Sequence, residues 1–265
     1  MDKKILESIF NIDELNNKIN NYVEGKKSII IGELSEKSVH HIIKNIISNK
    51  ENQEVKIKNY YADILLDENN ILEIQTGNFN KLRDKLLCYL EDYNVTIVYP
   101  ITYKKEINWI DKETGVIKQV AKRTEYSKFY KGFKELYKIK GFLDNNNISV
   151  VLLLVDIDEY RYLDGYDKTL KKRATKIDKV PKKIYDILIL NKKEDYNYFI
   201  NNLDGDFSVK DFKKYSKTTI KDAGICVNIL RYLGIIEFIR KDGREYIYQK
   251  NKGDSNEKTT NCNFR

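Results

Sequence analysis

Two acidic residues, Asp63 and Glu73, stand in apolar, β-rich runs where a charged side chain is unexpected. These runs, residues 60–66 and 71–76, flank a short polar turn at 67–70. Paired β-rich runs around such a turn are typical of a β-hairpin. Folding the chain about this turn brings Asp63 roughly opposite Glu73 or the residue after it.

Two carboxylates side by side on a sheet destabilise it. The repulsion is about 4 kcal/mol at a separation near 4 Å and an effective dielectric constant near 20. A bound cation, or protonation of one carboxyl, removes it. Hard divalent ions are held by one or two carboxylates, water and substrate phosphate, so the pair predicts a metal site. The alternative is an edge hairpin on which both carboxylates face solvent.

The elements around the hairpin place these acids. Residues 35–48 carry apolar side chains at helical spacing, and Glu36 extends that stripe one turn ahead of Val39 and His40. A short strand at 54–57 then leads into the hairpin.

The hairpin is followed by a second helix and a strand. Apolar residues recur at helical spacing from Phe79 to Leu90, and residues 95–99 form a buried strand that ends at Pro100. Strand, helix and strand in this length predict a parallel βαβ unit. The expected order is therefore helix, three antiparallel strands, helix, strand.

With Glu36, Asp63 and Glu73-Ile74-Gln75 in these positions, the chain resembles the PD-(D/E)XK nuclease superfamily. The resemblance implies an α/β fold, a restriction-endonuclease-like mixed sheet flanked by helices. It implies that Asp63 and Glu73 hold Mg²⁺ or Mn²⁺, with Glu36 assisting, for hydrolysis of phosphodiester bonds. The superfamily places a lysine two residues after the strand glutamate, whereas this chain has Gln75.

The Gln75 amide can orient a water molecule but carries no charge. Lys81 and Arg83, on the following helix, are the candidates for supplying that charge. Glu33 is the second choice for the helical acid. His40 is a candidate site neighbour through its i, i+4 relation to Glu36, although a lone helical histidine is more often a packing residue.

The remainder of a nuclease-like domain at 31–200 is less distinctive. Residues 1–30 predict a helical N-terminal extension, which either packs on the main domain or serves dimerisation or DNA contact. A second hairpin is expected around residues 107–119. Residues 150–155 form an unbroken apolar run, expected to be a central strand that ends in acids which are usually solvated: Asp156, Asp158 and Glu159.

Residues 168–183 form the strongest basic run of the chain and are expected to be a loop. Such a loop could track a phosphate backbone through contacts that are independent of sequence; the alternative is a solvated surface. The candidate phosphate-binding residues are Lys171, Lys172, Arg173 and Lys176.

Residues 205–250 form a separate compact unit after a polar hinge at 201–206. A short helix, a turn, a longer helix and a hairpin with an Asp-Gly turn resemble a winged helix-turn-helix domain. The resemblance implies DNA contact, with protein contact as the alternative. The candidate DNA-binding residues are Lys217, Thr218, Thr219, Lys221, Arg240, Lys241 and Arg244. Residues 251–265 are expected to be a disordered tail.

The composition fits these expectations. A net charge of +8 over 265 residues favours a polyanionic partner, most simply double-stranded DNA. Three scattered cysteines indicate neither a disulfide framework nor a zinc site, as in a cytoplasmic protein, and no apolar run reaches membrane-spanning length. A homodimer is left open.

The sequence thus predicts a metal-dependent DNA endonuclease-like protein positioned by a winged helix. The main alternative, favoured by Gln75, is a DNA-binding regulator whose nuclease-like domain is inactive. A structure-specific or RNA-acting enzyme is a third possibility.

Overall fold

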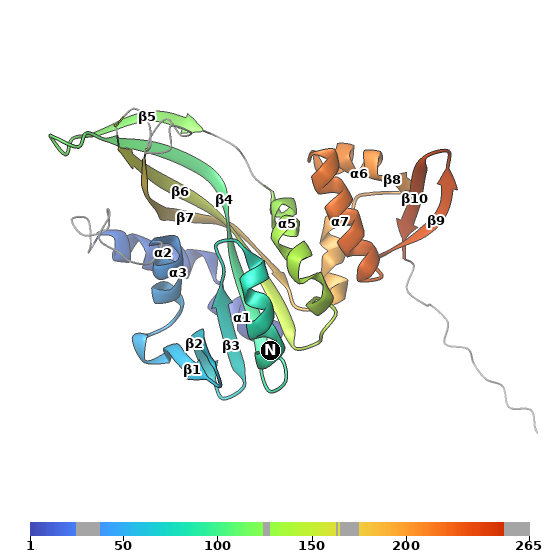
Figure 1. Ribbon diagram of the computed structural model, residues 1–265, viewed down its shortest axis with the longest axis horizontal. Helices are drawn as coiled ribbons and strands as arrows, with labels where there is room; N and C mark the ends of the chain where they lie inside the picture. The colour runs from blue at the N-terminus through green and yellow to red at the C-terminus, as the bar shows by residue number, and fades with distance from the viewer. Residues whose placement is uncertain (25–37, 124–127, 163, 165–174, 252–265) are drawn as a thin grey trace, which may run out of the picture. The chain divides into compact units, whose positions relative to one another are not determined.

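The computed structural model describes residues 1–24, 38–123, 128–162, 164 and 175–251 (Figure 1). The chain divides into two compact units, Met1–Asp195 and Tyr196–Arg265.

The first unit is built on a mixed sheet. Its described strands follow the order β1-β2-β3-β4-β6-β7, with β5 also paired to β4. The β3–β4 and β4–β6 pairs are parallel and the other pairs antiparallel. The strands are β1 (Gln53–Ile57), β2 (Tyr60–Asp67), β3 (Asn70–Ile74), β4 (Asn94–Ile110), β5 (Ile117–Arg123), β6 (Ile148–Tyr162) and β7 (Lys176–Leu190). The predicted α/β class, a mixed sheet flanked by helices, is confirmed.

Helices cover both faces of this sheet. The α-helices of the unit are α1 (Lys3–Ile9), α2 (Ile12–Glu24), α3 (Ser38–Ile47), α4 (Arg83–Tyr89) and α5 (Phe133–Leu136), and its 3-10 segments are η1 (Lys50–Asn52), η2 (Phe79–Leu82), η3 (Phe129–Gly132) and η4 (Tyr137–Phe142). On β6, Val151, Leu153 and Val155 face the cluster that contains α1, α2 and α3. Leu152 points the other way, toward Gly132 of η3. This alternation explains why β6 is an unbroken apolar run.

The predicted order around the hairpin is confirmed as α3, β1, β2, β3, α4 and β4. The apolar stripe of α3 is buried as expected, with Ile42 and Ile43 fully covered. The β3–α4–β4 segment is the predicted parallel βαβ unit.

The N-terminal segment is two helices, where the sequence suggested a single extension. The side chain of Asn11 accepts a hydrogen bond from the Glu14 N–H at 3.0 Å and begins α2. Leu6 and Ile19 belong to the hydrophobic cluster under the sheet, so these helices are part of the core. Asn16 also pairs with the backbone of β7: its amide donates to the Ile184 carbonyl at 3.0 Å and accepts from the Ile184 N–H at 2.7 Å.

The expectation that a strand ends at Pro100 is wrong, because β4 continues to Ile110. The carbonyl of Val98 accepts from Gln75 on the β3 side at 2.9 Å. Two residues on, the backbone of Pro100 faces that same side, where β3 has already ended at Ile74. The missing N–H of Pro100 therefore costs no bond in the ladder.

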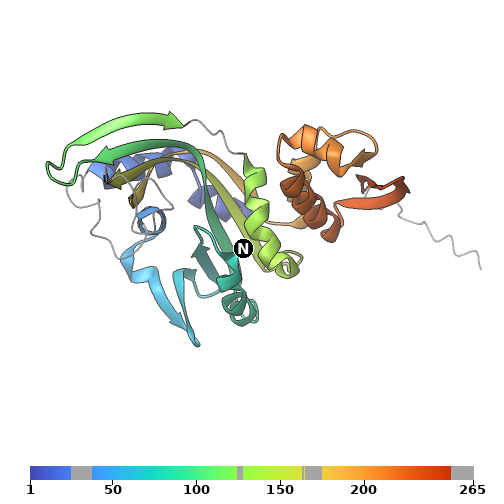
Figure 2. The same ribbon diagram turned by 45° about the horizontal axis from the view of Figure 1, so that its top comes forward.

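The long strands β4, β6 and β7 extend together with β5 (Figure 2), and two expectations about the residues of β6 and β7 are wrong. Residues 176–183 are not a loop but the first half of β7; β7 ends the strand order, and Pro181 is tolerated on such a terminal strand. The acids at 156–159 lie inside β6 rather than beyond its end. Glu159 is fully buried, and its Oε1 accepts from Arg161 Nε at 2.6 Å.

The second unit contains two helices joined by a short turn and a small sheet. Its elements are the end of η5 (Lys193–Ile200), β8 (Phe207–Ser208), α6 (Val209–Ser216), α7 (Ile220–Tyr232), β9 (Ile236–Asp242) and β10 (Glu245–Lys250), with strand order β8-β10-β9. Ser208 caps α6 through a capping box with Asp211, and Gly234 follows α7 with φ of 70°. The predicted helices and hairpin are therefore present.

The boundary between the units differs from the expected hinge at 201–206, because the chain divides after Asp195. Tyr196, Phe199 and Ile200 are buried, although they lie in a stretch whose sequence is mainly polar. The expected disordered tail at 251–265 lies outside the described residues beyond Asn251. Among the described helices, none is long and apolar enough to cross a lipid bilayer.

Candidate active site

The hairpin β2–β3 brings Asp63 and Glu73 together. Its pairing runs through Ile64 opposite Leu72, which sets the two acids opposite one another, one residue further along. There the carboxylate of Asp63 accepts a hydrogen bond from the Ile74 N–H at 2.8 Å. Asp63 thus reaches the backbone of β3, and the residue is only 8% exposed.

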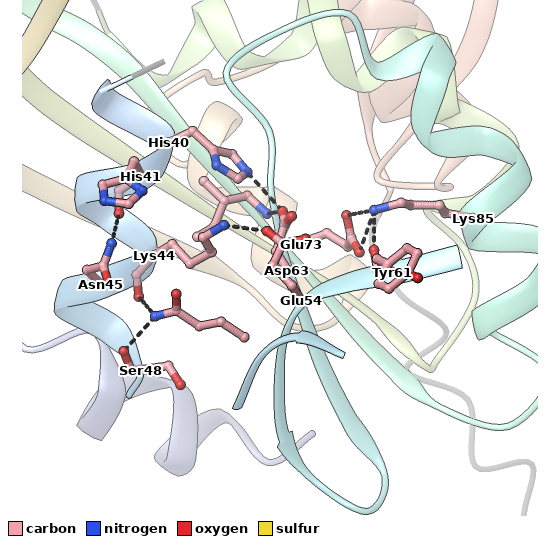
Figure 3. Close-up of polar contacts among 12 residues, drawn as sticks. His40, His41, Lys44, Asn45, Ser48, Glu54, Tyr61, Asp63, Glu73 and Lys85 are labelled. Carbon is pink, nitrogen blue, oxygen red and sulfur yellow. Dashed lines mark hydrogen bonds and ion pairs between the residues drawn. The ribbon is translucent and has the colours of Figure 1, made fainter. Parts of the chain in front are cut away.

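Helix α3 brings His40 to Asp63. The His40 Nε2 lies 3.1 Å from the Asp63 Oδ2 (Figure 3). The helix is fixed to β1 at its far end, because the Gln53 amide donates to the Ser48 carbonyl at 2.9 Å and Lys44 forms an ion pair with Glu54. Figure 3 shows these contacts along one side of α3. The candidate site neighbour His40 is therefore placed at the site.

Helix α4 brings Lys85 to Glu73. The Lys85 Nζ lies 2.9 Å and 3.1 Å from the two carboxylate oxygens of Glu73 and donates to the Tyr61 carbonyl at 2.7 Å (Figure 3). Glu73 is fully buried, whereas the Lys85 side chain keeps 23% of its surface exposed. An ammonium group therefore reaches a buried carboxylate from the solvent side.

The electrostatics of the two acids differ. Burial and the negative charge of Asp63 raise the pKa of Glu73 to about 8, and Lys85 offsets part of that rise. Burial acts against ionisation of Asp63 as well. The hydrogen bond from His40, the positive charge of His40 and the hydrogen bond from the Ile74 N–H outweigh burial and lower the pKa of Asp63. One carboxyl of the pair is thus held ionised while its neighbour resists ionisation.

Tyr89 lies on the same helix as Lys85, one turn later, and is fully buried. Burial, followed by the charge of Glu73, raises the pKa of its hydroxyl. This hydroxyl has no hydrogen-bond partner among the described residues. The surroundings of Glu73 therefore contain a second buried polar group, the Tyr89 hydroxyl, whose ionisation is also disfavoured.

The other predicted site residues are placed differently. Lys81 and Arg83 are exposed, and the cation at Glu73 is Lys85. Gln75 is half-buried just beyond β3, with its N–H bonded to the Val98 carbonyl. Glu33 and Glu36 lie outside the described residues.

The donor set partly fits a divalent cation. Two adjacent carboxylates, one of them with a strongly raised pKa, form a site whose repulsion a cation would relieve. In the described part of the chain, no group of three or more His, Cys, Asp or Glu residues is arranged to hold a metal ion. Asp63 and Glu73 would therefore hold an ion with water and substrate oxygens completing its shell.

The predicted phosphate-binding residues of the first unit fall mostly outside the described residues, namely Lys171, Lys172 and Arg173. Lys176 is the first residue of β7, and its Nζ lies 3.8 Å from Glu159. Its side chain is about half exposed.

In the second unit, the predicted DNA-binding residues form the turn between α6 and α7 and the β9–β10 hairpin. Lys217 ends α6 in the left-handed region, Thr219 caps α7, and Thr218 shares a hydrogen bond with Ser216 at 2.8 Å. These threonines therefore build the turn. The cations among these predicted residues are all exposed, and Arg240 pairs with Asp206; they are Lys217, Lys221, Arg240, Lys241 and Arg244.

Lys85 is the site residue that sequence reasoning missed. Lys81, Arg83 and Lys85 are all cations near the start of one helix, and their spacing does not rank them. The available signal was the position of Lys85 next to Leu86 and four residues before Tyr89, both of which are buried. A cation beside the buried stripe reaches inward more readily than one on the opposite side.

Comparison with other proteins gives a family without a described activity. An uncharacterized protein of Treponema pallidum (strain Nichols) is 22% identical over 145 residues, which cover 54% of this chain and 57% of that protein. The chain thus spans little more than half the length of this relative. No solved structure matches. A family model matches residues 37–191, more than half of the chain and including both acids and Lys85. The chain therefore belongs to the family described as "Domain of unknown function (DUF8091)".

Proposed function

We propose that the first unit is a metal-dependent nuclease that hydrolyses phosphodiester bonds in DNA. The observation that carries the proposal is a buried cluster of two opposed carboxylates and one amine, formed by Asp63, Glu73 and Lys85. The order of elements around it and the Glu-Ile-Gln sequence at the end of β3 resemble the PD-(D/E)XK superfamily, which supports the same proposal.

Each residue has a distinct part in this proposal. Asp63 and Glu73 bind Mg²⁺ or Mn²⁺. Bound there, the ion would lower the pKa of a water molecule and neutralise the scissile phosphate. Lys85, whose Nζ lies 2.9 Å from Glu73, supplies the positive charge that Gln75 lacks and stabilises the charge that develops at phosphorus. The Gln75 amide orients the attacking water.

The protonation states suit this role. Asp63 is held as a carboxylate by His40 and the Ile74 N–H. Glu73, with its pKa near 8, releases its proton when a cation binds, because metal ligands must be deprotonated. Binding therefore depends on pH and becomes tighter as the pH rises toward that value.

We propose that the second unit positions the enzyme on DNA. Its helix-turn-helix and hairpin resemble a winged helix, in which the second helix commonly enters the major groove. Support comes from the exposed cations Lys217 in the turn before α7, Lys221 in the first turn of α7 and Arg244 on the hairpin.

The test is a cleavage assay with Mg²⁺ or Mn²⁺ on duplex, junction and single-stranded DNA and on RNA. Asp63→Asn and Glu73→Gln are expected to abolish cleavage, and Lys85→Met to reduce it about 10²–10³-fold, as for loss of one positioned charge stabiliser. Binding of nucleic acid should be almost unchanged. Cleavage of RNA or junctions alone would change the substrate class.

Two controls match these variants. Asp84→Asn removes an exposed acid from the first turn of α4, and Lys81→Met removes an exposed lysine from the preceding turn. Both should cleave as the wild type does. Equal cleavage by wild type, Asp63→Asn and Glu73→Gln would refute the assignment, and loss of activity in Lys81→Met alone would move the role of Lys85 to Lys81.

A DNA-binding regulator with an inactive nuclease-like unit is the second candidate. It is favoured by Gln75 and by the ion pair between Lys85 and Glu73, which gives the buried acid a partner without a metal. Thermal unfolding with and without Mg²⁺ separates the two, because a ligand stabilises the fold by RT ln(1 + [L]/Kd). A regulator of this kind would show no shift.

A further inference from the structure

A cavity of about 240 Å³ lies in the first unit beside the candidate active site. Val39 lines it and is the neighbour of His40 on α3. Thr76 also lines it, two residues after Ile74, whose N–H is bonded to Asp63. Since two residues span at most about 7 Å, the cavity wall at Thr76 lies close to the Ile74 backbone that Asp63 contacts.

The walls of the cavity combine an apolar interior with a basic rim. Val155 and Ile157, from the buried face of β6, are apolar, while Lys176 and Lys179 of β7 are exposed. The side chains of Thr102 and Asp178 add hydrogen-bonding groups. The volume corresponds to about eight water molecules at roughly 30 Å³ each, which is room enough for one nucleobase.

We infer that this cavity is a subsite for one unstacked nucleotide of a single-stranded nucleic acid, an inference that rests on the proposed nuclease function. The base lies between Val39, Val155 and Ile157, because enzymes that extract a base hold its faces against apolar side chains. Lys176 and Lys179 contact the adjoining phosphates. A duplex is the poorer ligand of this subsite, since its base must first be unpaired and unstacked.

The test uses the full chain in EDTA, so that no cleavage occurs. The probe is a single-stranded DNA that carries 2-aminopurine, whose fluorescence rises when it leaves its stacked neighbours. Wild type is expected to bind the probe with a rise in fluorescence, and the matched duplex is expected to give a smaller rise, because its 2-aminopurine must first be unpaired and unstacked.

Thr102→Trp fills the cavity from β4, where an aromatic residue suits a strand. It should weaken probe binding at least ten-fold and remove the fluorescence rise. Thr114→Trp adds the same indole to the exposed β4–β5 turn and should behave as wild type. Equal binding and fluorescence for Thr102→Trp and wild type, or no binding of single strands by wild type, would overturn the subsite.

A surface variant decides the matter if Thr102→Trp does not fold. In the double variant Lys176→Gln, Lys179→Gln, the slope of log K for probe binding against log salt concentration should become less steep by about 1.4. Each phosphate contact on a single strand contributes about 0.7 to the steepness. An unchanged slope would overturn the proposed contacts.

Failure of the subsite and failure of the nuclease function are distinguishable. Binding that follows these expectations without cleavage in Mg²⁺ or Mn²⁺ keeps the subsite and removes the nuclease. Cleavage that is equally efficient in Thr102→Trp and wild type keeps the nuclease and removes the subsite.

Discussion

The raised pKa of Glu73 makes the stability of the protein depend on pH in a specific way. The pKa of this carboxyl is about 8 in the fold, compared with a usual value of 4.5. Between these values, the folded state holds a proton that the unfolded state has lost, so stability falls as pH rises. The stabilisation that the protonated Glu73 contributes is fully present below pH 4.5 and is lost as the pH rises from 4.5 through 8.

The magnitude follows from linkage. One proton taken up on folding changes the free energy of unfolding by about 1.4 kcal/mol per pH unit. From pH 5.5 to 7.5, Glu73 therefore lowers the stability of the wild type by roughly 2–3 kcal/mol. Glu73→Gln keeps the shape of the side chain and removes its titration. Its stability relative to the wild type should rise by the same amount over the same interval.

The assay is urea unfolding of both proteins at pH 5.5, 6.5 and 7.5 in EDTA. Taking the difference between the two proteins cancels other groups in the window, including Asp156 and Asp158, whose pKa values burial raises. Asp63 does not interfere, because its pKa is lowered and its contribution is lost only at more acidic pH. A stability difference that is independent of pH would refute the reasoning.

Three smaller predictions can be measured on the same material. Lys85→Met removes the ion pair that partly offsets the raised pKa of Glu73. The pKa of Glu73 should therefore rise further in this variant, and the loss of stability with pH should extend to higher pH. An unaltered titration would show that Lys85 does not act on Glu73. Asn16→Ala leaves the Ile184 backbone N–H and carbonyl unpaired beside α2 and should cost about 1–3 kcal/mol in urea unfolding, whereas the exposed Asn17→Ala should cost almost nothing. Ser208→Ala removes the capping box of α6 and should cost about 1 kcal/mol; full stability in that variant would contradict the capping role.

The sequence was informative where one local pattern decides the outcome. A hairpin has a fixed side-chain period and a short turn, so the opposition of Asp63 and Glu73 followed from counting residues about the turn. The stripe of α3 likewise predicted which side chains are buried.

The sequence was less informative where partners distant in the chain decide the outcome. Pro100 ends a strand by local rules, yet β4 continues because β3 has already ended beside it. The basic run 176–183 becomes a strand because β6 offers it a partner along its length. Lys85 was missed because the rotation of α4 depends on how η2 begins the helix, and a residue count does not fix that rotation.

The central claim, that Asp63 and Glu73 together bind a divalent cation, is tested most directly by calorimetric titration of Mn²⁺ into the full chain at pH 8. We expect wild type and the exposed-acid variant Asp84→Asn to bind the ion, and both Asp63→Asn and Glu73→Gln to lose that binding. Absence of Mn²⁺ binding by the wild type, or binding that persists when both acids are replaced, would contradict the claim.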